Sequence, residues 1–228
     1  MIKVVSFDIF QTLVDVNERI PQIWQSILQE KYSKELGERG GRAVLNSYPD
    51  AIKVALNSTD YFYTMDEVYM ICARKALKEL QYPVTARVVV NSLLQEHSKA
   101  PFYPDALPCI NKLKENYRVI LSSDSNHIMV DDLIAIMQPE TAFISDDLHN
   151  YKGSKDEQFF AQVLKLMDLS PKEIVHIGDS SHDIIGAKRA GIPCVWLNRE
   201  NRVWSQEYNP DVTIHSLSEL KEVITTME

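Results

Sequence analysis

The sequence lacks several features that define whole classes of protein. It has no stretch of about 20 uninterrupted apolar residues, and its N-terminal MIKVVSFDIF has no long apolar segment followed by small residues. These absences argue against a membrane span and a signal peptide. Cys72, Cys109 and Cys194 are odd in number and widely spaced, which favours reduced thiols over a disulfide framework. We therefore expect a cytoplasmic protein.

Basic blocks and zinc motifs are also missing. The 24 Lys and Arg residues face 32 Asp and Glu residues, a formal net charge of −8, and form no basic block, which argues against a nucleic-acid-binding face. The histidines show neither HxxxH nor HExxH spacing and no CxxC accompanies them, so a zinc site is not expected. At 228 residues the chain can form one core domain with an insertion, and nothing in it indicates its oligomeric state.

Short β-branched runs recur along the chain, and four of the five end in Ser or Asp. Such runs are typical of the buried strands of a parallel sheet, and the stretches between them are long enough for helices. The fold class we predict is α/β, with a Rossmann-like parallel sheet. The runs are KVVSFD, RVILSSD, TAFISDD, EIVHIGD and PCVWLN.

Roughly a hundred residues separate the first two runs, and this stretch carries helical patterns instead of strand patterns. We predict an all-helical subdomain over residues 16–100, inserted into a core formed by residues 1–15 and 101–228. Thr64 and Thr85 are candidate N-caps. The stretches GERGG and YPV are expected to interrupt helices. The amphipathic segments are ERIPQIWQSILQEKY, GRAVLNSYPDAIKVAL, TMDEVYMICARKALKEL and TARVVVNSLLQEH.

Polar side chains follow the predicted strands, where open parallel sheets bind ligands. Asp8 ends the first run, and Asp179 ends EIVHIGD. Asp183 comes four residues after Asp179 and can join it at the start of a helix. Taken singly, each of these residues fits a cap or a turn equally well.

In combination, FDIFQTLVD, a strand ending in Ser, a lysine after a turn, and HIGDSSHDIIGAKRAGI resemble the four ordered motifs of the haloacid-dehalogenase-like hydrolase superfamily. The resemblance covers nearly the whole chain. It implies a Rossmann-like core with a helical cap inserted after the first strand, an aspartate nucleophile, a Mg²⁺ cofactor, and small phosphorylated substrates in most members.

The resemblance also assigns roles to single residues. Asp8 matches the nucleophile, and Thr12 matches the threonine that supports the first loop. Ser123, followed by Asp124, matches the serine that hydrogen-bonds the transferred group, with Ser122 as an alternative one residue away. We expect Phe10, Thr12 and Asp124 to help position the substrate.

The lysine of the third motif is Lys152 when counted forward from the acidic turn, and Lys155 when counted back from GDSSHD. We favour Lys152, because a loop before the next helix accommodates extra residues easily. The implied Mg²⁺ ligands are Asp8, the carbonyl of Phe10, Asp179 and Asp183. Clustered carboxylates need nearby cations, which agrees with both a lysine and a metal.

Phe10 departs from the phosphatase pattern, in which an acid stands two residues after the nucleophile and protonates the leaving group. General acid–base catalysis typically contributes about 10²–10⁴-fold. We therefore rank first a Mg²⁺-dependent hydrolase whose leaving group obtains its proton elsewhere. Halide needs no proton, and dehalogenating relatives carry an aromatic residue at this position, but they lack the GD pair; 2-haloacid dehalogenation is the second interpretation.

Two further interpretations rank lower. Phosphonate-cleaving relatives have a small residue at position 10, so Phe10 argues against that reaction. A ligand-binding domain without turnover is the non-enzymatic alternative, since it would keep the ligand residues and lose the acid.

Overall fold

The computed structural model describes residues 1–155 and 158–227. It divides into two compact units. One contains Met1–Asp15, Phe102–Asp124 and the chain from Ile134 onward, and the other contains Val16–Pro101 and Ser125–Leu133. Each unit is described by itself.

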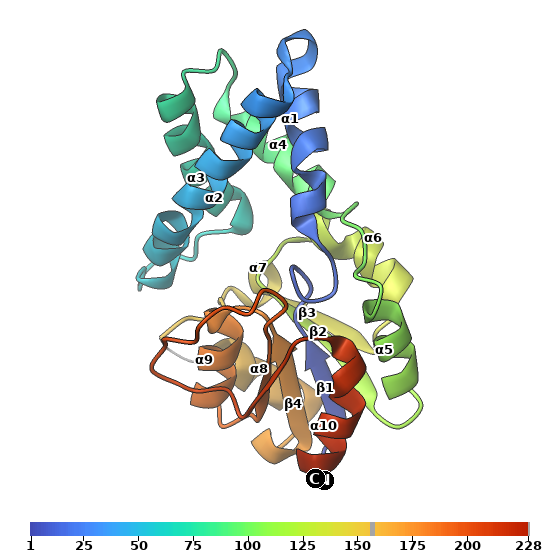
Figure 1. The fold of residues 1–228 in the computed structure, drawn as a ribbon. Coiled ribbons are helices and arrows are strands. Elements are labelled where there is room, and N and C mark those ends of the chain that lie inside the picture. The colour runs from blue at the N-terminus through green and yellow to red at the C-terminus, as the bar shows by residue number, and fades with distance from the viewer. Residues whose placement is uncertain (156–157, 228) are drawn as a thin grey trace. The chain divides into compact units, whose positions relative to one another are not determined.

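The first unit, the core unit, contains a parallel sheet of six strands in the order β3-β2-β1-β4-β5-β6 (Figure 1). The first five strands coincide with the predicted runs, and β6 lies in the C-terminal segment. The strand order places β1 at the centre with β2 and β4 on either side, so the residues after these three strands meet at one edge. The strands are β1 (Val4–Phe7), β2 (Arg118–Ser123), β3 (Thr141–Ile144), β4 (Ile174–Gly178), β5 (Cys194–Leu197) and β6 (Val212–Ile214).

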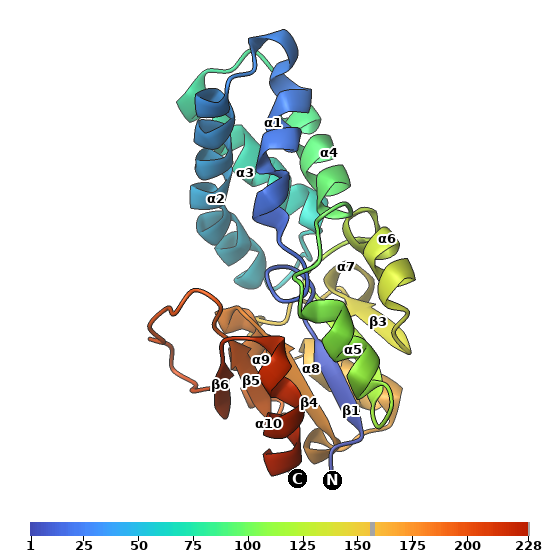
Figure 2. The same ribbon diagram turned by 45° about the vertical axis from the view of Figure 1, so that its right-hand side comes forward.

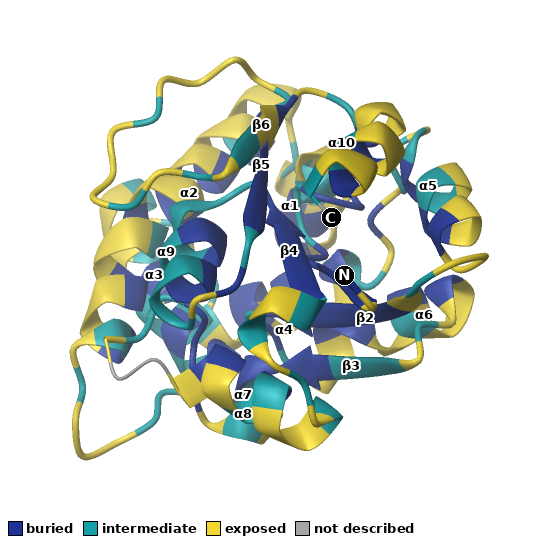
Figure 3. Cartoon of the chain, turned by 90° about the horizontal axis from the view of Figure 1, so that it is seen from below, coloured by how far each residue is buried: buried dark blue, intermediate teal, exposed yellow. Residues whose placement is uncertain are grey.

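Helices cover both faces of this sheet, which explains why its central strands are buried throughout (Figures 2 and 3). Helices α5 (Ala106–Leu113) and α10 (Leu220–Met227) lie on one face, and α8 (Gln158–Met167) and α9 (Ser181–Arg189) on the other. The short helix α7 (Ser145–Leu148) follows β3, and the 3₁₀ turns η3 (Pro171–Glu173) and η4 (Leu217–Glu219) precede β4 and α10. The predicted α/β fold is confirmed.

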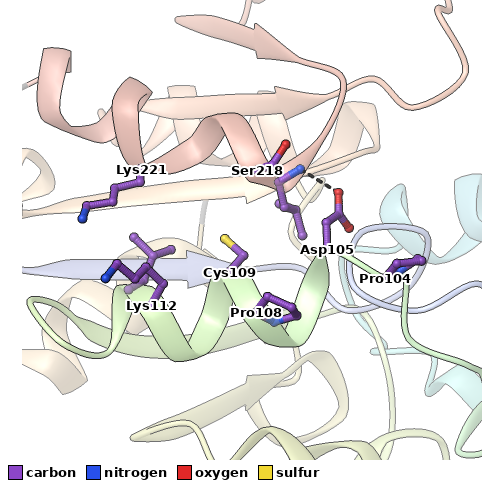
Figure 4. Close-up of a pocket in the computed structure, with 9 residues that line it drawn as sticks. Pro104, Asp105, Pro108, Cys109, Lys112, Ser218 and Lys221 are labelled. Atoms are coloured by element: carbon purple, nitrogen blue, oxygen red, sulfur yellow. Dashed lines mark hydrogen bonds between the residues drawn. The ribbon is translucent and has the colours of Figure 1, made fainter.

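Asp105, at the start of α5, connects three distant parts of the core unit. Its carboxylate accepts hydrogen bonds from two Arg199 nitrogens at 2.8 and 3.0 Å. It also accepts one from the Leu217 backbone nitrogen at 2.9 Å, and Figure 4 shows Asp105 beside the η4–α10 segment. Arg199 Nη2 also donates to the Thr12 carbonyl at 3.1 Å. The loop after β1 is therefore tied to the segments after β5 and β6.

The second unit, the helical unit, contains η1 (Val16–Arg19), α1 (Ile20–Leu28), η2 (Gln29–Lys31), α2 (Lys34–Leu56), α3 (Met65–Leu80), α4 (Ala86–His97) and the first part of α6 (His127–Met137). Thr64 caps α3 in a reciprocal capping box with Glu67. Thr85 precedes α4 without a side-chain cap bond. Among the described residues, no helix is long and apolar enough to span a membrane.

The expectation that GERGG interrupts a helix is wrong, because α2 runs through it from Lys34 to Leu56. The glycines permit close packing between helices: a Cβ on Gly40 would collide with the Trp24 ring, and one on Gly41 would come within 2.7 Å of Ile20. This packing outweighs the weak intrinsic helix propensity of glycine. YPV, in contrast, does lie between α3 and α4.

Candidate active site

The candidate nucleophile stands at the carboxyl end of the central strand. The Asp8 backbone nitrogen donates to the Ile177 carbonyl at 2.9 Å, which extends the pairing between β1 and β4 by one residue. The chain then turns sharply: Gln11 has a φ of 59°, and its nitrogen donates to the Val14 carbonyl at 2.7 Å. Asp8 is only 6% exposed, so its carboxylate is held in a largely dry environment.

Lys152 lies between two carboxylates. Its Nζ atom is 2.6 Å from Asp8 Oδ1 and also donates to Asp183 Oδ1. Its backbone nitrogen donates to Asp124 Oδ1 at 2.9 Å, which fixes the loop that carries it. The ammonium is buried with its partners, as a buried charge requires.

Asp183 is fully engaged by its neighbours. Besides Lys152, its Oδ1 atom lies 3.0 Å from His176 Nε2, while Oδ2 accepts hydrogen bonds from the Ser180 hydroxyl at 2.6 Å and backbone nitrogen at 3.0 Å. Gly178 makes room for this carboxylate, since a Cβ there would collide with Asp183. A cation that bound Asp183 directly would have to displace one of these partners.

Asp179 is paired with a cation as well. Arg202 Nη2 lies 3.0 Å from Asp179 Oδ2 and donates to the Asp179 carbonyl at 2.8 Å. That carbonyl also accepts from Trp196 Nε1 at 2.9 Å. Lys152 and Arg202 therefore compensate part of the negative charge of these carboxylates.

The electrostatic environment shifts the pKa values of the three carboxylates in different directions. Burial, assisted by the neighbouring Asp183 and Asp179, raises the pKa of Asp8, while Lys152 opposes the shift. Burial also raises the pKa of Asp179 to about 6. For Asp183 burial alone would raise the pKa, but Lys152 and His176 outweigh it and hold the pKa well below its usual range.

These carboxylates form a plausible divalent-cation site. One oxygen from each of Asp8, Asp179 and Asp183 lies within 4.8 Å of the others. A cluster of carboxylate oxygens is the donor set that hard cations such as Mg²⁺ prefer. The residues therefore fit the implied metal, with Asp8 and Asp179 more accessible to it than Asp183.

Two buried hydroxyls near the nucleophile lack hydrogen-bond partners among the described residues: Thr12 Oγ1 and Ser123 Oγ. Ser122 differs, because its hydroxyl lies 2.8 Å from Ser6 Oγ. Successive strand residues point to opposite faces, so only one of the two serines joins that buried network. Unpaired buried hydroxyls are costly, and a bound substrate could satisfy them.

The other predicted residues occupy distinct environments. Lys155 is exposed, unlike Lys152. Asp124 is partly buried, and desolvation raises its pKa against the opposing effect of Lys152. His182 Nδ1 lies 3.9 Å from Asp124 Oδ2, beyond hydrogen-bond distance. Phe10 is half-buried in the loop after Asp8.

Sequence reasoning missed the contacts of His176 and Arg202. His176 lies inside the apolar strand β4 and is buried, but it also contacts Asp183. Arg202 follows β5 at the edge of the sheet that carries Asp8 and Asp179. Its position in NRENR, just after a strand, was the available signal.

Two hollows in the core unit differ in chemistry. One of about 120 Å³ adjoins Asp179, and its lining includes Gln11, Tyr103, Leu197 and Arg202. The other, of about 320 Å³, lies between α5 and the η4–α10 segment (Figure 4). The larger hollow is mostly apolar and contains none of the clustered carboxylates, so it is not the candidate active site.

Comparison with protein families identifies residues 2–191 as a haloacid dehalogenase-like hydrolase. The chain belongs to this family and is a hydrolase. Its relatives differ in substrate.

Pyrophosphatase PpaX from Bacillus cereus (strain B4264) is 30% identical over 84 residues, which cover 36% of this chain and only 38% of that enzyme. (S)-2-haloacid dehalogenase 1 from Pseudomonas sp. (strain CBS-3) is 25% identical over 95% of this chain and 92% of that enzyme. Among solved structures, the magnesium-bound HAD-hydrolase YfnB from Bacillus subtilis has a TM-score of 0.82 and 16% identity, with 98% of each chain covered.

The buried position of Lys152 leads to a prediction. Lys152→Met should lower the free energy of unfolding by about 3–5 kcal/mol near neutral pH, because it leaves Asp8 and Asp183 buried without their cation. The native carboxyls would then bind protons at pH values where the unfolded chain has released them. The stability deficit should therefore grow as the pH rises.

Urea unfolding at pH 5 and pH 8 measures this effect. Lys155→Met is the matched control, since Lys155 is exposed, and should leave stability nearly unchanged. Equal stability of the two variants at both pH values would contradict the assignment of Lys152.

Proposed function

We propose that this protein is an aspartate-nucleophile hydrolase that acts, with Mg²⁺, on a small phosphorylated metabolite whose leaving group departs without a proton from residue 10. The observation that carries the proposal is the contact of 2.6 Å between Lys152 Nζ and Asp8 Oδ1, deep in the core unit. It supplies positive charge where negative charge develops during phosphoryl transfer.

In the first step, an Asp8 carboxylate oxygen attacks phosphorus and the bond between phosphorus and the leaving group breaks, with the bonding pair going to the leaving group. Lys152 and Ser123 bind the non-bridging oxygens, and Thr12 can donate its hydroxyl to the same group. In the second step, water attacks the phosphorus of the aspartyl phosphate and Asp8 departs as a carboxylate.

The proposed Mg²⁺ ligands are Asp8, the Phe10 carbonyl and Asp179, with Asp183 acting directly or through water. When bound, the cation supplies charge neutralisation for the transferred group. The side chain of Phe10 is not a ligand in this proposal, so the substitution of the usual acid affects proton transfer and leaves the metal site intact.

Carbon–halogen hydrolysis is the second candidate, and a specific observation favours it. Arg202 contacts Asp179 and Lys152 contacts both Asp8 and Asp183, so the carboxylates have counter-ions without a metal. Asp8 would attack the carbon that carries the halogen, and the halide would leave with the bonding pair and need no proton. Phe10 suits this reaction, and the dehalogenase from Pseudomonas aligns over nearly the whole chain.

A substrate panel tests the proposal. We expect Mg²⁺-dependent release of phosphate from acetyl phosphate and p-nitrophenyl phosphate, and loss of that activity in Asp8→Asn. Halide release from 2-chloropropionate without Mg²⁺, also lost in Asp8→Asn, would replace the first candidate with the second. If the protein turns over neither the phosphates nor the haloacid, both candidate functions are refuted.

The proton requirement leads to a prediction at Phe10. Phe10→Asp should accelerate hydrolysis of alkyl phosphates much more than that of aryl or acyl phosphates, because only a poor leaving group needs protonation badly. General acid catalysis limits the gain to about 10²–10⁴-fold, and a grafted carboxylate without tuned neighbours should fall short of it. Steady-state rates for both ester types measure the effect, and equal gains would contradict this explanation.

Arg202 leads to a prediction about metal affinity. If the cation binds Asp179, Arg202→Gln should tighten Mg²⁺ binding by up to about 5-fold, the modest effect expected for a partly exposed pair. Asp179→Asn should abolish binding. Because burial raises the pKa of Asp179 to about 6, affinity should fall as the pH drops below that value.

Isothermal titration calorimetry measures these affinities. Arg118→Gln is the control, since it removes the same charge from an exposed pair with Glu140 at the opposite end of β2. Unchanged Mg²⁺ affinity in both Arg202→Gln and Asp179→Asn would show that the cation binds elsewhere.

A further inference from the structure

A buried chain of polar side chains runs across the three central strands of the core sheet. Ser6 on β1 lies opposite His176 on β4, and Ser6 Oγ is 3.0 Å from His176 Nδ1. The same hydroxyl is 2.8 Å from Ser122 Oγ on β2. All three side chains are fully buried, and the Phe160 ring packs against the imidazole with a centroid distance of 4.8 Å.

The chain leads directly to the nucleophile. His176 Nε2 is 3.0 Å from Asp183 Oδ1, the oxygen that also accepts from Lys152, and Lys152 is 2.6 Å from Asp8. Each step is a hydrogen bond in the absence of bulk water, where such bonds are strongest. The position of the Lys152 ammonium therefore depends on where Asp183 Oδ1 is held.

Three groups hold the Asp183 carboxylate. Ser180 fixes Oδ2, the backbone at Gly178 lies directly against the carboxyl group, and His176 fixes Oδ1. His176 is the one among them that binds the same oxygen as Lys152. Without His176, one hydrogen bond fewer would hold the Asp183 carboxylate against the flexible side chain of Lys152.

Hydrogen-bond chemistry determines the form of the imidazole. An ionised carboxylate only accepts, so His176 must carry a proton on Nε2. Ser6 donates its own hydroxyl hydrogen to Ser122 Oγ, so its oxygen faces His176 Nδ1 as an acceptor and holds the ring with Nε2 directed at Asp183.

We propose that His176 is a positioning residue, which fixes Asp183 Oδ1 and thereby holds the Lys152 ammonium at Asp8. The inference rests on the proposed function of Asp8 as the nucleophile. His176 touches neither substrate nor reacting atoms, so its effect passes through Asp183 and Lys152 alone.

Paired variants separate positioning from packing. His176→Leu removes the donor, whereas the side-chain amide of His176→Gln can still donate to Asp183. We expect kcat to fall on the order of 10–100-fold in His176→Leu, as for other residues that orient catalytic groups, with little change in KM. His176→Gln should recover most of the loss. Rates are measured well below each variant's Tm, so that only folded protein contributes.

A second measurement does not depend on turnover. In protein labelled with ¹⁵N-lysine, the buried Lys152 ammonium should give a slowly exchanging signal, assigned by its absence in Lys152→Met. The signal should broaden or disappear in His176→Leu and persist in His176→Gln. Ser6→Ala, a smaller change, should weaken it in the same direction if His176→Leu does not fold.

His97→Leu is the matched control. His97 is also buried, and it binds Tyr69 and the Leu93 carbonyl inside the helical unit. This variant should lower Tm and leave the Lys152 signal unchanged.

The outcomes are distinct. A Lys152 signal that is unaffected in both His176→Leu and Ser6→Ala, or equal kcat losses in His176→Leu and His176→Gln, would overturn the positioning role. No turnover in the wild type, together with a Lys152 signal that is lost in His176→Leu and kept in His176→Gln, would refute the proposed function and support the positioning of Lys152 by His176.

Discussion

The ammonium of Lys152, shared between Asp8 and Asp183, is the interaction on which the candidate site depends. A buried carboxylate or ammonium is expensive unless it is paired, and a single lysine here satisfies two carboxylates that would otherwise repel each other. The three residues come from the end of β1, the loop before α8 and the first turn of α9. These three side chains come together only when the strands that precede them pair in one sheet. The stability of the core unit and its chemistry therefore depend on the same contacts.

Much of the fold could be predicted because its signals are local. Short β-branched runs indicate buried parallel strands, and Ser or Asp residues mark the ends of these strands. The prediction at GERGG was wrong because the structural effect of a glycine depends on what packs against it. Gly40 and Gly41 leave room for side chains of α1, and no local sequence pattern encodes that contact. The order of the strands was likewise set by packing between distant segments.

The candidate site could be predicted only where a motif names the residue. Asp8 and Asp183 stand in such motifs, and the choice between Lys152 and Lys155 depended on loop length, which spacing cannot determine. No motif assigns a role to Arg202 or His176. Each acts through a contact that forms only after β4 and β5 are in place, and the apolar surroundings of His176 in EIVHIGD conceal its polar partners.

The balance of charge around the nucleophile distinguishes the two candidate reactions. The carboxylates near Asp8 outnumber Lys152 and Arg202, so the site retains negative charge. A phosphate ester would add up to two further charges, and the Mg²⁺ proposed at Asp179 would offset them. A 2-haloacid adds only one charge, on the carboxylate bonded to the carbon under attack. Phe10 supplies no proton in either reaction, and only the phosphate reaction needs one for a poor leaving group. Phosphoryl transfer is therefore the candidate reaction that requires both a metal and a good leaving group. Carbon–halogen hydrolysis requires neither a metal nor a proton donor at residue 10.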